Sequence, residues 1–122
     1  MAALIIMNGI CEGLKTIAAG GGRGVLAEIA ETTGSAPRKA GARMLLSPDG
    51  TFSGTVGGGS LEYRAELECR AVRDSGVPVR RAYSLSGAHG EGEDIGAICG
   101  GGAVIDFRPI DAAAARALLE TM

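Results

Sequence analysis

The stretch GTVGGGSLE, residues 54–62, contains three consecutive glycines between a predicted strand and a predicted helix. At such a joint, the first backbone N–H groups of the helix have no partner within the helix. Glycine allows a positive φ and a close approach of these groups to a ligand, while the helix dipole favours negative charge. The stretch therefore predicts a binding site for phosphate or carboxylate oxygens. Its candidate residues are Gly57, Gly58, Gly59 and Ser60, with Ser60 as the N-cap.

The same stretch differs from the established phosphate-binding motifs. A P-loop carries Lys after its last glycine, whereas Ser60, Leu61 and Glu62 follow here, and the stretch is not GxGxxG. Glu62 already complements the helix dipole from the first predicted turn. Glycines at a strand-to-helix joint also serve a tight turn or close packing. The stretch alone leaves both interpretations open.

Two more stretches have the character of a glycine-containing loop at a strand end. They are GSAPRKAGAR, residues 34–43, and ICGGG, residues 98–102. Loops at the ends of neighbouring strands can meet at one edge of a sheet. We therefore expect the three stretches to line one shared site.

The first half of the chain is predicted to form a helix, a strand and a hairpin. Residues 2–19 carry apolar side chains at helical spacing and end before three glycines. That apolar stripe consists of Leu4, Met7, Cys11, Leu14 and Ala18. Residues 25–32 alternate in their second half and end in turn formers, which favours a strand. Residues 42–47 and 51–56 flank Pro48-Asp49-Gly50, a sequence typical of a hairpin turn.

The second half is predicted to form a helix, two strands and a final helix. Residues 61–75 have one apolar helical face, made of Leu61, Ala65, Cys69 and Val72. Residues 79–85 and 103–107 are predicted strands, the acidic, glycine-rich segment 86–96 is a predicted surface loop, and Asp111 caps the last helix. The predicted fold is a single α/β domain with a mixed β-sheet of about five strands flanked by helices, in the order αβββαββα.

Composition and charge limit the classes of function. The chain has 122 residues, enough for one domain, and its net charge of −2 without a Lys/Arg run argues against nucleic acid and acidic membranes as partners. Cys11, Cys69 and Cys99 form no CxxC pair, so a reducing compartment, the cytoplasm, is expected. The apolar N-terminal segment is too short to span a bilayer and is predicted to be a soluble helix.

Four features in this order resemble the N-terminal domain of the XdhC/CoxI family, the xanthine dehydrogenase accessory proteins. They are GSAPRKAGARM, the hairpin with Asp-Gly at its turn, GTVGGGSLE and ICGGGAVIDFRPI. The resemblance as a whole extends over nearly the entire chain, residues 1–122. The resemblance implies a maturation factor that binds the molybdenum cofactor, protects it while its terminal sulfur is installed, and delivers it to a molybdenum hydroxylase apo-enzyme. The client would be of the xanthine dehydrogenase or CO dehydrogenase type. A cofactor-binding chaperone is expected rather than a catalyst, so no catalytic residue is assigned.

The resemblance assigns roles to residues of the three stretches. Molybdopterin carries a phosphate, and its dinucleotide form a pyrophosphate, so glycine loops and a helix N-terminus would supply amide donors. Arg38 would add a bidentate contact to a phosphate or to an oxo group on molybdenum. Cys99 would offer a soft thiolate to molybdenum or a dithiolene sulfur, or act in sulfur handling, with a small buried apolar residue as the alternative. The complete predicted cofactor-binding set is Ser35, Pro37, Arg38, Gly57, Gly58, Gly59, Ser60, Glu62, Cys99, Gly100 and Gly101.

Two features depart from the family pattern. Many members have Cys directly after the glycines, where this chain has Ser60, so any sulfur or metal contact is assigned to Cys99. Larger members resemble two-domain proteins with a C-terminal Rossmann-like domain, whereas this sequence ends at Met122. We therefore expect either a stand-alone short member or one half of a split protein with a separate Rossmann-type partner. A homodimer would add stability to so small a sheet domain.

Other candidate residues have weaker support. An acidic group around the single histidine matches no standard metal-ligand spacing, and solvated surface is the preferred interpretation. Its members are His89, Glu91, Glu93 and Asp94. Glu28 and Glu31 are expected on opposite faces of their strand, so at most one of them can face the site. Cys11 and Cys69 are expected in the core.

Two alternative functions remain open. One is an enzyme that processes a nucleotide or phosphate, or that transfers sulfur through Cys99, although the sequence reveals no catalytic base. The other is an interaction module, in which the glycine loops are structural and the domain binds its missing half or a second copy of itself. The motifs favour cofactor binding over both.

Overall fold

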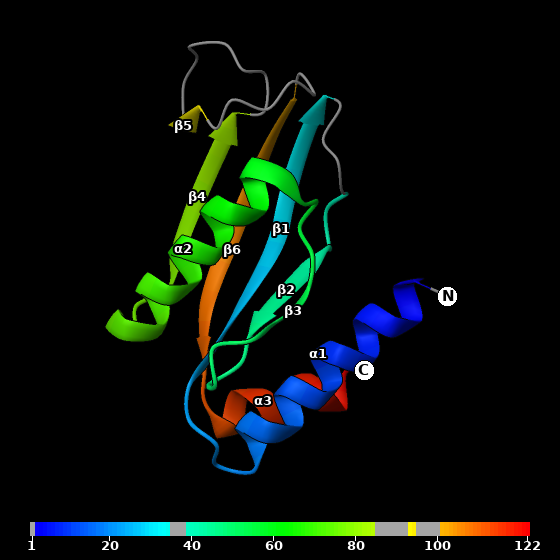
Figure 1. Ribbon diagram of the computed structural model, residues 1–122, viewed down its shortest axis with the longest axis vertical. Helices are drawn as coiled ribbons and strands as arrows, with labels where there is room; N and C mark the ends of the chain where they lie inside the picture. Colours follow the sequence, from blue (N-terminus) through cyan, green and yellow to red (C-terminus); the bar gives the residue numbers. More distant parts are fainter. Residues whose placement is uncertain (1, 35–38, 85–92, 95–100) are drawn as a thin grey trace.

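The computed structural model describes the backbone of residues 2–34, 39–84, 93–94 and 101–122, and the side chains of these residues except 2–8, 93 and 94. Each pair of successive helices is separated by a run of strands (Figure 1). The helices are α1 (Ala2–Ala18), α2 (Gly59–Ser75) and α3 (Ala112–Glu120). The strands are β1 (Gly24–Gly34), β2 (Arg43–Leu46), β3 (Phe52–Gly54), β4 (Val79–Ser84), β5 (Glu93–Asp94) and β6 (Gly101–Ile110).

The strands form one sheet in the order β3-β2-β1-β6-β4-β5. Neighbouring strands are antiparallel, except that the two-residue strand β5 runs parallel to β4. The predicted mixed-sheet α/β fold in the order αβββαββα is therefore confirmed. Strand β5 is an addition, because it lies inside the segment 86–96 that was predicted to be a loop throughout.

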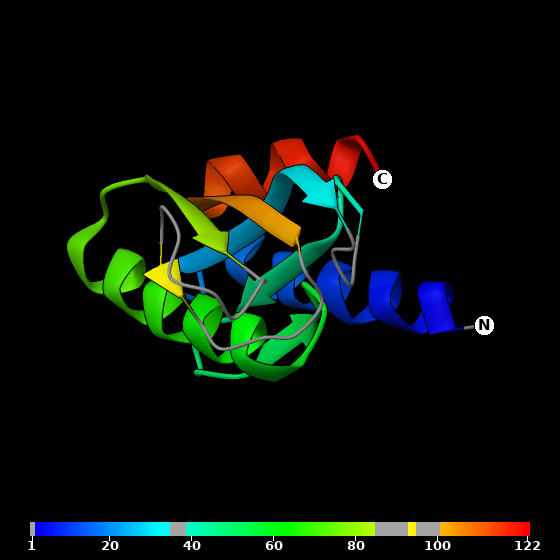
Figure 2. The same ribbon diagram turned by 90° about the horizontal axis from the view of Figure 1, so that it is seen from above.

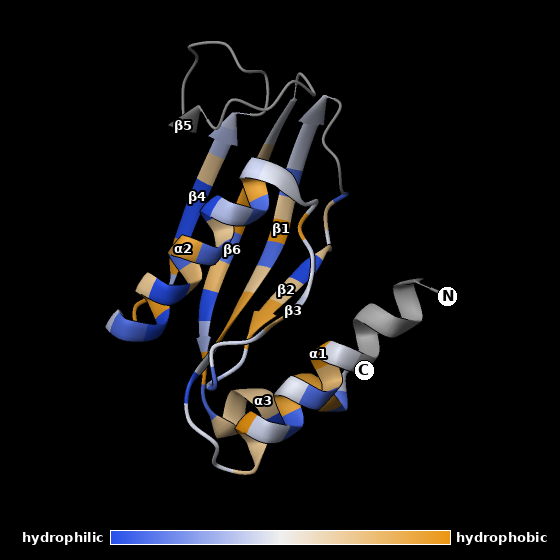
Figure 3. Ribbon diagram, viewed as in Figure 1, coloured by the Kyte–Doolittle hydropathy of each residue, from blue (hydrophilic) through white to orange (hydrophobic). Residues whose placement is uncertain are grey.

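Helices cover both faces of the sheet. Helix α2 lies along one face, while α1 and α3 lie together against the other face, at the end where β1 begins (Figures 1 and 2). Strands β1 and β2 are hydrophobic in this part of the sheet (Figure 3). Val25, Leu26 and Ala27 are consecutive and all buried, because their alternating side chains enter the two helix-covered faces in turn.

The core under α2 is built from one helical face and alternate strand residues. The predicted apolar face of α2 is confirmed, since all four of its members are buried. Phe107 of β6 is fully buried in the same cluster, which also contains Ile29 and Ile105. Burying one such side chain contributes about 1.5–3 kcal/mol, so this core holds α2 firmly on the sheet.

The second core lies under α1 and α3. Among the described side chains of α1, the buried hydrophobic ones are Ile10, Leu14 and Ile17, and they pack with residues of β1, β2, β6 and α3. The sheet and α3 residues of this cluster are Leu26, Leu45, Ile110 and Ala115. Cys11 is only partly buried, and its Sγ lies 4.0 Å from Met122 Sδ. The prediction of Cys11 on the buried stripe is wrong, because the stripe is rotated by one residue around the helix.

A β-bulge interrupts the pairing of β1 with β6. Ile29 faces Ile105 and Glu31 faces Val104, which leaves Ala30 as the extra residue. An extra residue reverses the alternation of side chains, so Glu28 and Glu31 lie on the same face of the sheet. The prediction of opposite faces is therefore wrong.

The shared face of the two glutamates carries a charged network beyond α1 and α3. Arg43 Nε lies 3.0 Å from Glu28 Oε2. Arg80 Nε lies 2.7 Å from Asp106 Oδ1, and its Nη1 lies 3.9 Å from Glu31 Oε2. These charges are paired with one another across neighbouring strands, in the manner that stabilises antiparallel sheets.

The hairpin and the last helix form as predicted. Ser47 N donates to Thr51 O at 2.8 Å, and Gly50 takes a positive φ of 93° at the turn. Asp111 is the N-cap of α3, and its carboxylate accepts a hydrogen bond from Ala114 N at 2.8 Å. Within the described parts of the chain, no helix combines the length and apolar character needed to cross a bilayer.

Candidate functional site

The ends of two predicted loops meet at one edge of the sheet. Gly34, the last residue of β1, is the cross-strand partner of Gly101, the first residue of β6. The stretch GSAPRKAGAR therefore begins beside the point where ICGGG ends. Five members of the predicted site lie outside the described residues: Ser35, Pro37, Arg38, Cys99 and Gly100.

The third stretch lies beside the returning end of the first. Gly41 N donates to Ile29 O at 2.8 Å and Ile29 N donates to Ala42 O at 2.9 Å, which ties the end of GSAPRKAGAR to β1. Thr55 N then donates to Arg43 O at 3.1 Å. Helix α2 begins in the half of the molecule where β1 ends (Figure 1). The stretch GSAPRKAGAR thus contacts both of the others: its first residue pairs with Gly101, and its last residue accepts a hydrogen bond from Thr55.

The three glycines before α2 are required by the backbone. Gly57, Gly58 and Gly59 have φ values of 130°, 76° and 61°, which residues with a side chain adopt only with strain. Among the described residues, nothing lies within 4 Å of a Cβ atom placed on Gly58 or Gly59. Of the two structural explanations, the tight turn is therefore correct for these two glycines, and close packing is not.

Helix α2 starts earlier than the sequence indicated. Its N-cap is Gly58, so Ser60 is the second helical residue and its side chain is exposed. The prediction of Ser60 as the N-cap is wrong, because the positive φ values of the glycines allow the chain to enter the helix two residues sooner.

Glu62, in the first turn of α2, accepts hydrogen bonds from the residues that connect β3 to the helix. Its Oε1 accepts hydrogen bonds from Val56 N and Gly58 N, both at 3.3 Å, and from Thr55 Oγ1. Gly57 N donates to Thr55 Oγ1 at 3.0 Å. The carboxylate thus supplies negative charge at the helix N-terminus, as expected for an acidic residue in the first turn.

Three backbone amides at the start of α2 do not bond to Glu62 and stay available as hydrogen-bond donors. Within the described residues, the amides of Gly59, Ser60 and Leu61 have no acceptor, as is general for a first helical turn. Gly59 and Ser60 are exposed. This end of the helix can therefore donate hydrogen bonds to an anion that approaches from solvent.

The cysteine of α2, Cys69, offers little reactivity. Burial raises the pKa of the Cys69 thiol to about 12, and nearby Glu66 and Glu68 act in the same direction. Such a thiol stays protonated and unreactive, which confirms the expected core role of Cys69. Among the residues whose side chains are described, no three of the types His, Cys, Asp and Glu gather as metal ligands would. His89 and Glu91 lie outside the described residues.

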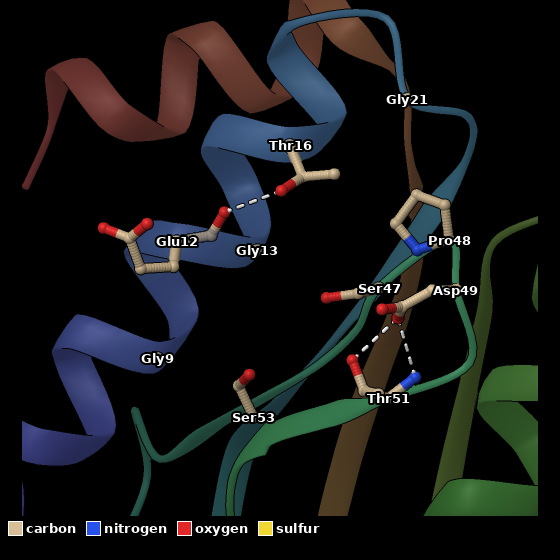
Figure 4. Close-up of a pocket in the computed structure, with 10 residues that line it drawn as sticks. All are labelled: Gly9, Glu12, Gly13, Thr16, Gly21, Ser47, Pro48, Asp49, Thr51 and Ser53. Carbon is tan, nitrogen blue, oxygen red and sulfur yellow. Dashed lines mark hydrogen bonds between the residues drawn. The ribbon is translucent and has the colours of Figure 1, made fainter.

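Sequence reasoning missed a pocket of about 550 Å³ between α1 and the β2–β3 hairpin (Figure 4). Its walls include Gly9 and Gly13 of α1 and the hydroxyl side chains of Ser47, Thr51 and Ser53. The available signal was the pair of glycines four residues apart on one helical face, opposite hydroxyl residues at alternate strand positions.

Comparisons with known proteins agree with the motifs. The family model of the XdhC and CoxI family matches residues 17–84, more than half of the chain. A search of curated proteins gives no match. The chain is similar to a solved structure described as a xanthine dehydrogenase from Bacillus halodurans, with 30% sequence identity and a TM-score of 0.72. The similarity covers 91% of this chain but 33% of the other protein, so the chain spans about one third of that protein's length. The chain belongs to the XdhC and CoxI family.

Proposed function

We propose that this protein is an accessory factor that binds the molybdenum cofactor at its three glycine-containing stretches and delivers it to a xanthine dehydrogenase-type or CO dehydrogenase-type enzyme. The observation that carries the proposal is the cross-strand pairing of Gly34 with Gly101 in a chain of this family. That pairing places side by side the described ends of the two stretches to which the resemblance assigns Arg38 and Cys99. When bound, the cofactor would supply the redox chemistry of the client enzyme, and the chain itself would act as a carrier.

The start of α2 fits the phosphate of molybdopterin. The free amides of Gly59, Ser60 and Leu61 are donors, and no described residue approaches within 4 Å of a Cβ position on Gly58 or Gly59. The Glu62 carboxylate lies nearby, and its Oε1 already accepts three hydrogen bonds from residues of the joint. In this arrangement a phosphate oxygen accepts from the exposed amides, while Arg38 balances its charge.

The remaining roles follow from residue chemistry. Cys99 would contact molybdenum or a dithiolene sulfur, since a thiolate is a soft ligand and Ser60 is not. Gly100, Gly101, Ser35 and Pro37 would shape the loops around the pterin. We place the protein in the cytoplasm, because its cysteines show no disulfide pattern.

The decisive experiment for delivery is reconstitution of a client. The chain is loaded with cofactor anaerobically, separated from free cofactor and mixed with the apo-hydroxylase. Loaded protein should activate the client faster than the same amount of free cofactor, and Arg38→Ala should carry less cofactor than Arg108→Ala, a matched change at an exposed arginine of β6. Equal activation by free cofactor would contradict delivery.

A second candidate function rests on the length of the structural neighbour. The similarity covers 33% of that protein, and in this second candidate function the domain binds cofactor only together with a Rossmann-type domain. Adding such a domain from a longer relative should then produce a stable complex in size-exclusion chromatography and cofactor uptake that the chain alone lacks. A homodimer would be visible in the same experiment as a larger species without the partner.

A further inference from the structure

Gly13 allows α1 to lie close to the β2–β3 hairpin beside the pocket. A Cβ on Gly13 would lie 2.6 Å from Leu45 Cδ2 and 2.8 Å from Ser47 Oγ, so these side chains would have to shift to admit it. A Cβ on Gly9 would lie 3.4 Å from Ser53 Cβ, an ordinary contact. The helix wall is therefore smooth backbone, and the polar groups of the pocket come largely from the hairpin.

The hairpin presents its hydroxyl groups on the face towards α1. Leu45 pairs with Ser53, and Ser47 N bonds to Thr51 O, so the two strands place these four residues on one face. Figure 4 shows the hydroxyl groups of Ser47 and Ser53 directed into the space between helix and hairpin.

Ser47 is a buried polar residue whose side chain has no partner. The residue is only 6% exposed, and within the described part of the chain neither its Oγ nor that of Ser53 takes part in a hydrogen bond. No fully buried side-chain polar atom of the described residues lacks a partner, so the Ser47 hydroxyl stays accessible at the pocket wall. A hydroxyl group in this position, at the wall of a pocket, is suited to contact a bound molecule.

The charge of the pocket is negative. Asp49 accepts hydrogen bonds from Thr51 Oγ1 at 2.7 Å and from Thr51 N at 3.0 Å, and these bonds hold its pKa below the usual 3.8. Glu12 lies at the rim, where Lys15 Nζ is 3.4 Å from its Oε1. The ten residues that line the pocket include two carboxylates and no Lys, Arg or His. The pocket therefore offers acceptors and repels anions.

We propose that this pocket binds a small organic cation with a primary ammonium group. Ser47 Oγ and Ser53 Oγ accept two of its N–H bonds, and the Asp49 carboxylate supplies the opposite charge. The volume of about 550 Å³ lies in the range of small-molecule sites, roughly 300–1,000 Å³. The site contains none of the residues assigned to the cofactor, and its chemistry is opposite to that of a phosphate site, so the two proposals stand independently.

The test is a titration of the full chain followed by backbone amide NMR at constant ionic strength. The probes are 1,4-diaminobutane, neutral 1,4-butanediol and anionic succinate. The diamine should shift the amides of Gly13, Ser47, Thr51 and Ser53 in a saturable way, and the other two probes should not. Equal shifts with the diol, or diamine shifts spread over other acidic surfaces without saturation at these residues, would overturn the proposal.

Variants separate binding from folding. Ser47→Ala should weaken diamine binding by about tenfold or more, the usual effect of losing a hydrogen bond to a charged group. Ser75→Ala, at an exposed serine near the end of α2, should leave the affinity unchanged. If Ser47→Ala does not fold, Ser53→Ala and Asp49→Asn serve in its place. Unchanged affinity in the folded pocket variants would contradict the assignment.

Discussion

Gly34 and Gly101 are cross-strand partners at the last described position of the β1–β6 pairing. Their backbones are therefore separated by one strand spacing, roughly 5 Å. The loop after Gly34 and the loop before Gly101 leave the sheet at the same place. The proposed shared cofactor site depends on the pairing of Gly34 with Gly101. Single substitutions in the helices and strands around this pairing test the structure that supports it.

Glu62 is expected to stabilise the joint before α2. Glu62→Ala removes the acceptor for three hydrogen bonds and should lower the free energy of unfolding by about 1–3 kcal/mol. Urea unfolding measures the loss. Glu120→Ala, at the end of α3, should change stability by less than about 0.5 kcal/mol. Similar losses in both variants would show that the joint does not depend on Glu62.

The two glycines of α1 should respond in opposite directions to alanine. Gly9→Ala adds a methyl group at an ordinary contact distance and should stabilise the helix by about 0.5–1 kcal/mol. Gly13→Ala collides with Leu45 and Ser47 and should cost about 1–3 kcal/mol despite the same gain in helix propensity. Thermal unfolding of the two variants checks this. If both were stabilising, α1 would not lie against the hairpin as described.

Phe107 is expected to be the costliest phenylalanine to remove. It is fully buried, so Phe107→Ala should lower the free energy of unfolding by about 3–5 kcal/mol. Phe52 is only partly buried, with the guanidinium of Arg70 5.2 Å above its ring, and Phe52→Ala should cost less. Chemical denaturation of both variants provides the comparison. A larger loss at Phe52 would contradict the assignment of the core.

Asp106 should make stability depend on acid pH. The hydrogen bond from Arg80 lowers the pKa of Asp106 below its usual 3.8, so the folded state holds this proton less tightly than the unfolded state. The resulting stabilisation is complete above the unfolded pKa and is lost as the pH falls through the folded pKa. Its size is small, because the pair is exposed to solvent.

Asp106→Asn should therefore flatten the loss of stability between about pH 6 and about pH 2. Arg80→Ala should remove the same part of the pH dependence, because its guanidinium is the main cause of the shift. Unfolding free energies measured across this range test both. If the unfolding free energy depends on pH to the same extent in both variants, other carboxylates cause the dependence.

The fold could be predicted well because its signals are local. The apolar face of α2 repeats at helical spacing, Pro48-Asp49-Gly50 has turn chemistry, and Asp111 is a favoured N-cap residue. Each of these features was found where the sequence indicated.

The predictions were wrong or incomplete where contacts between distant segments determine which side chains are buried. Residues of α1 are apolar on several sides, so only the position of α3 and the hairpin selects Ile10 and Ile17 over Cys11. The bulge at Ala30 depends on the pairing of β1 with β6, which a strand pattern does not contain. The pocket beside Ser47 is formed by a helix and a hairpin brought together, and no single segment encodes it.

The measurement that tests the central claim most directly is anaerobic titration of the full chain with molybdopterin, followed by the pterin absorbance. The account predicts saturable binding that Arg38→Ala and Cys99→Ala each weaken, while Arg108→Ala and Cys11→Ala, which lie outside the three stretches, leave it unchanged. Absence of saturable binding, or equal losses in the control variants, would contradict a cofactor site at the glycine loops.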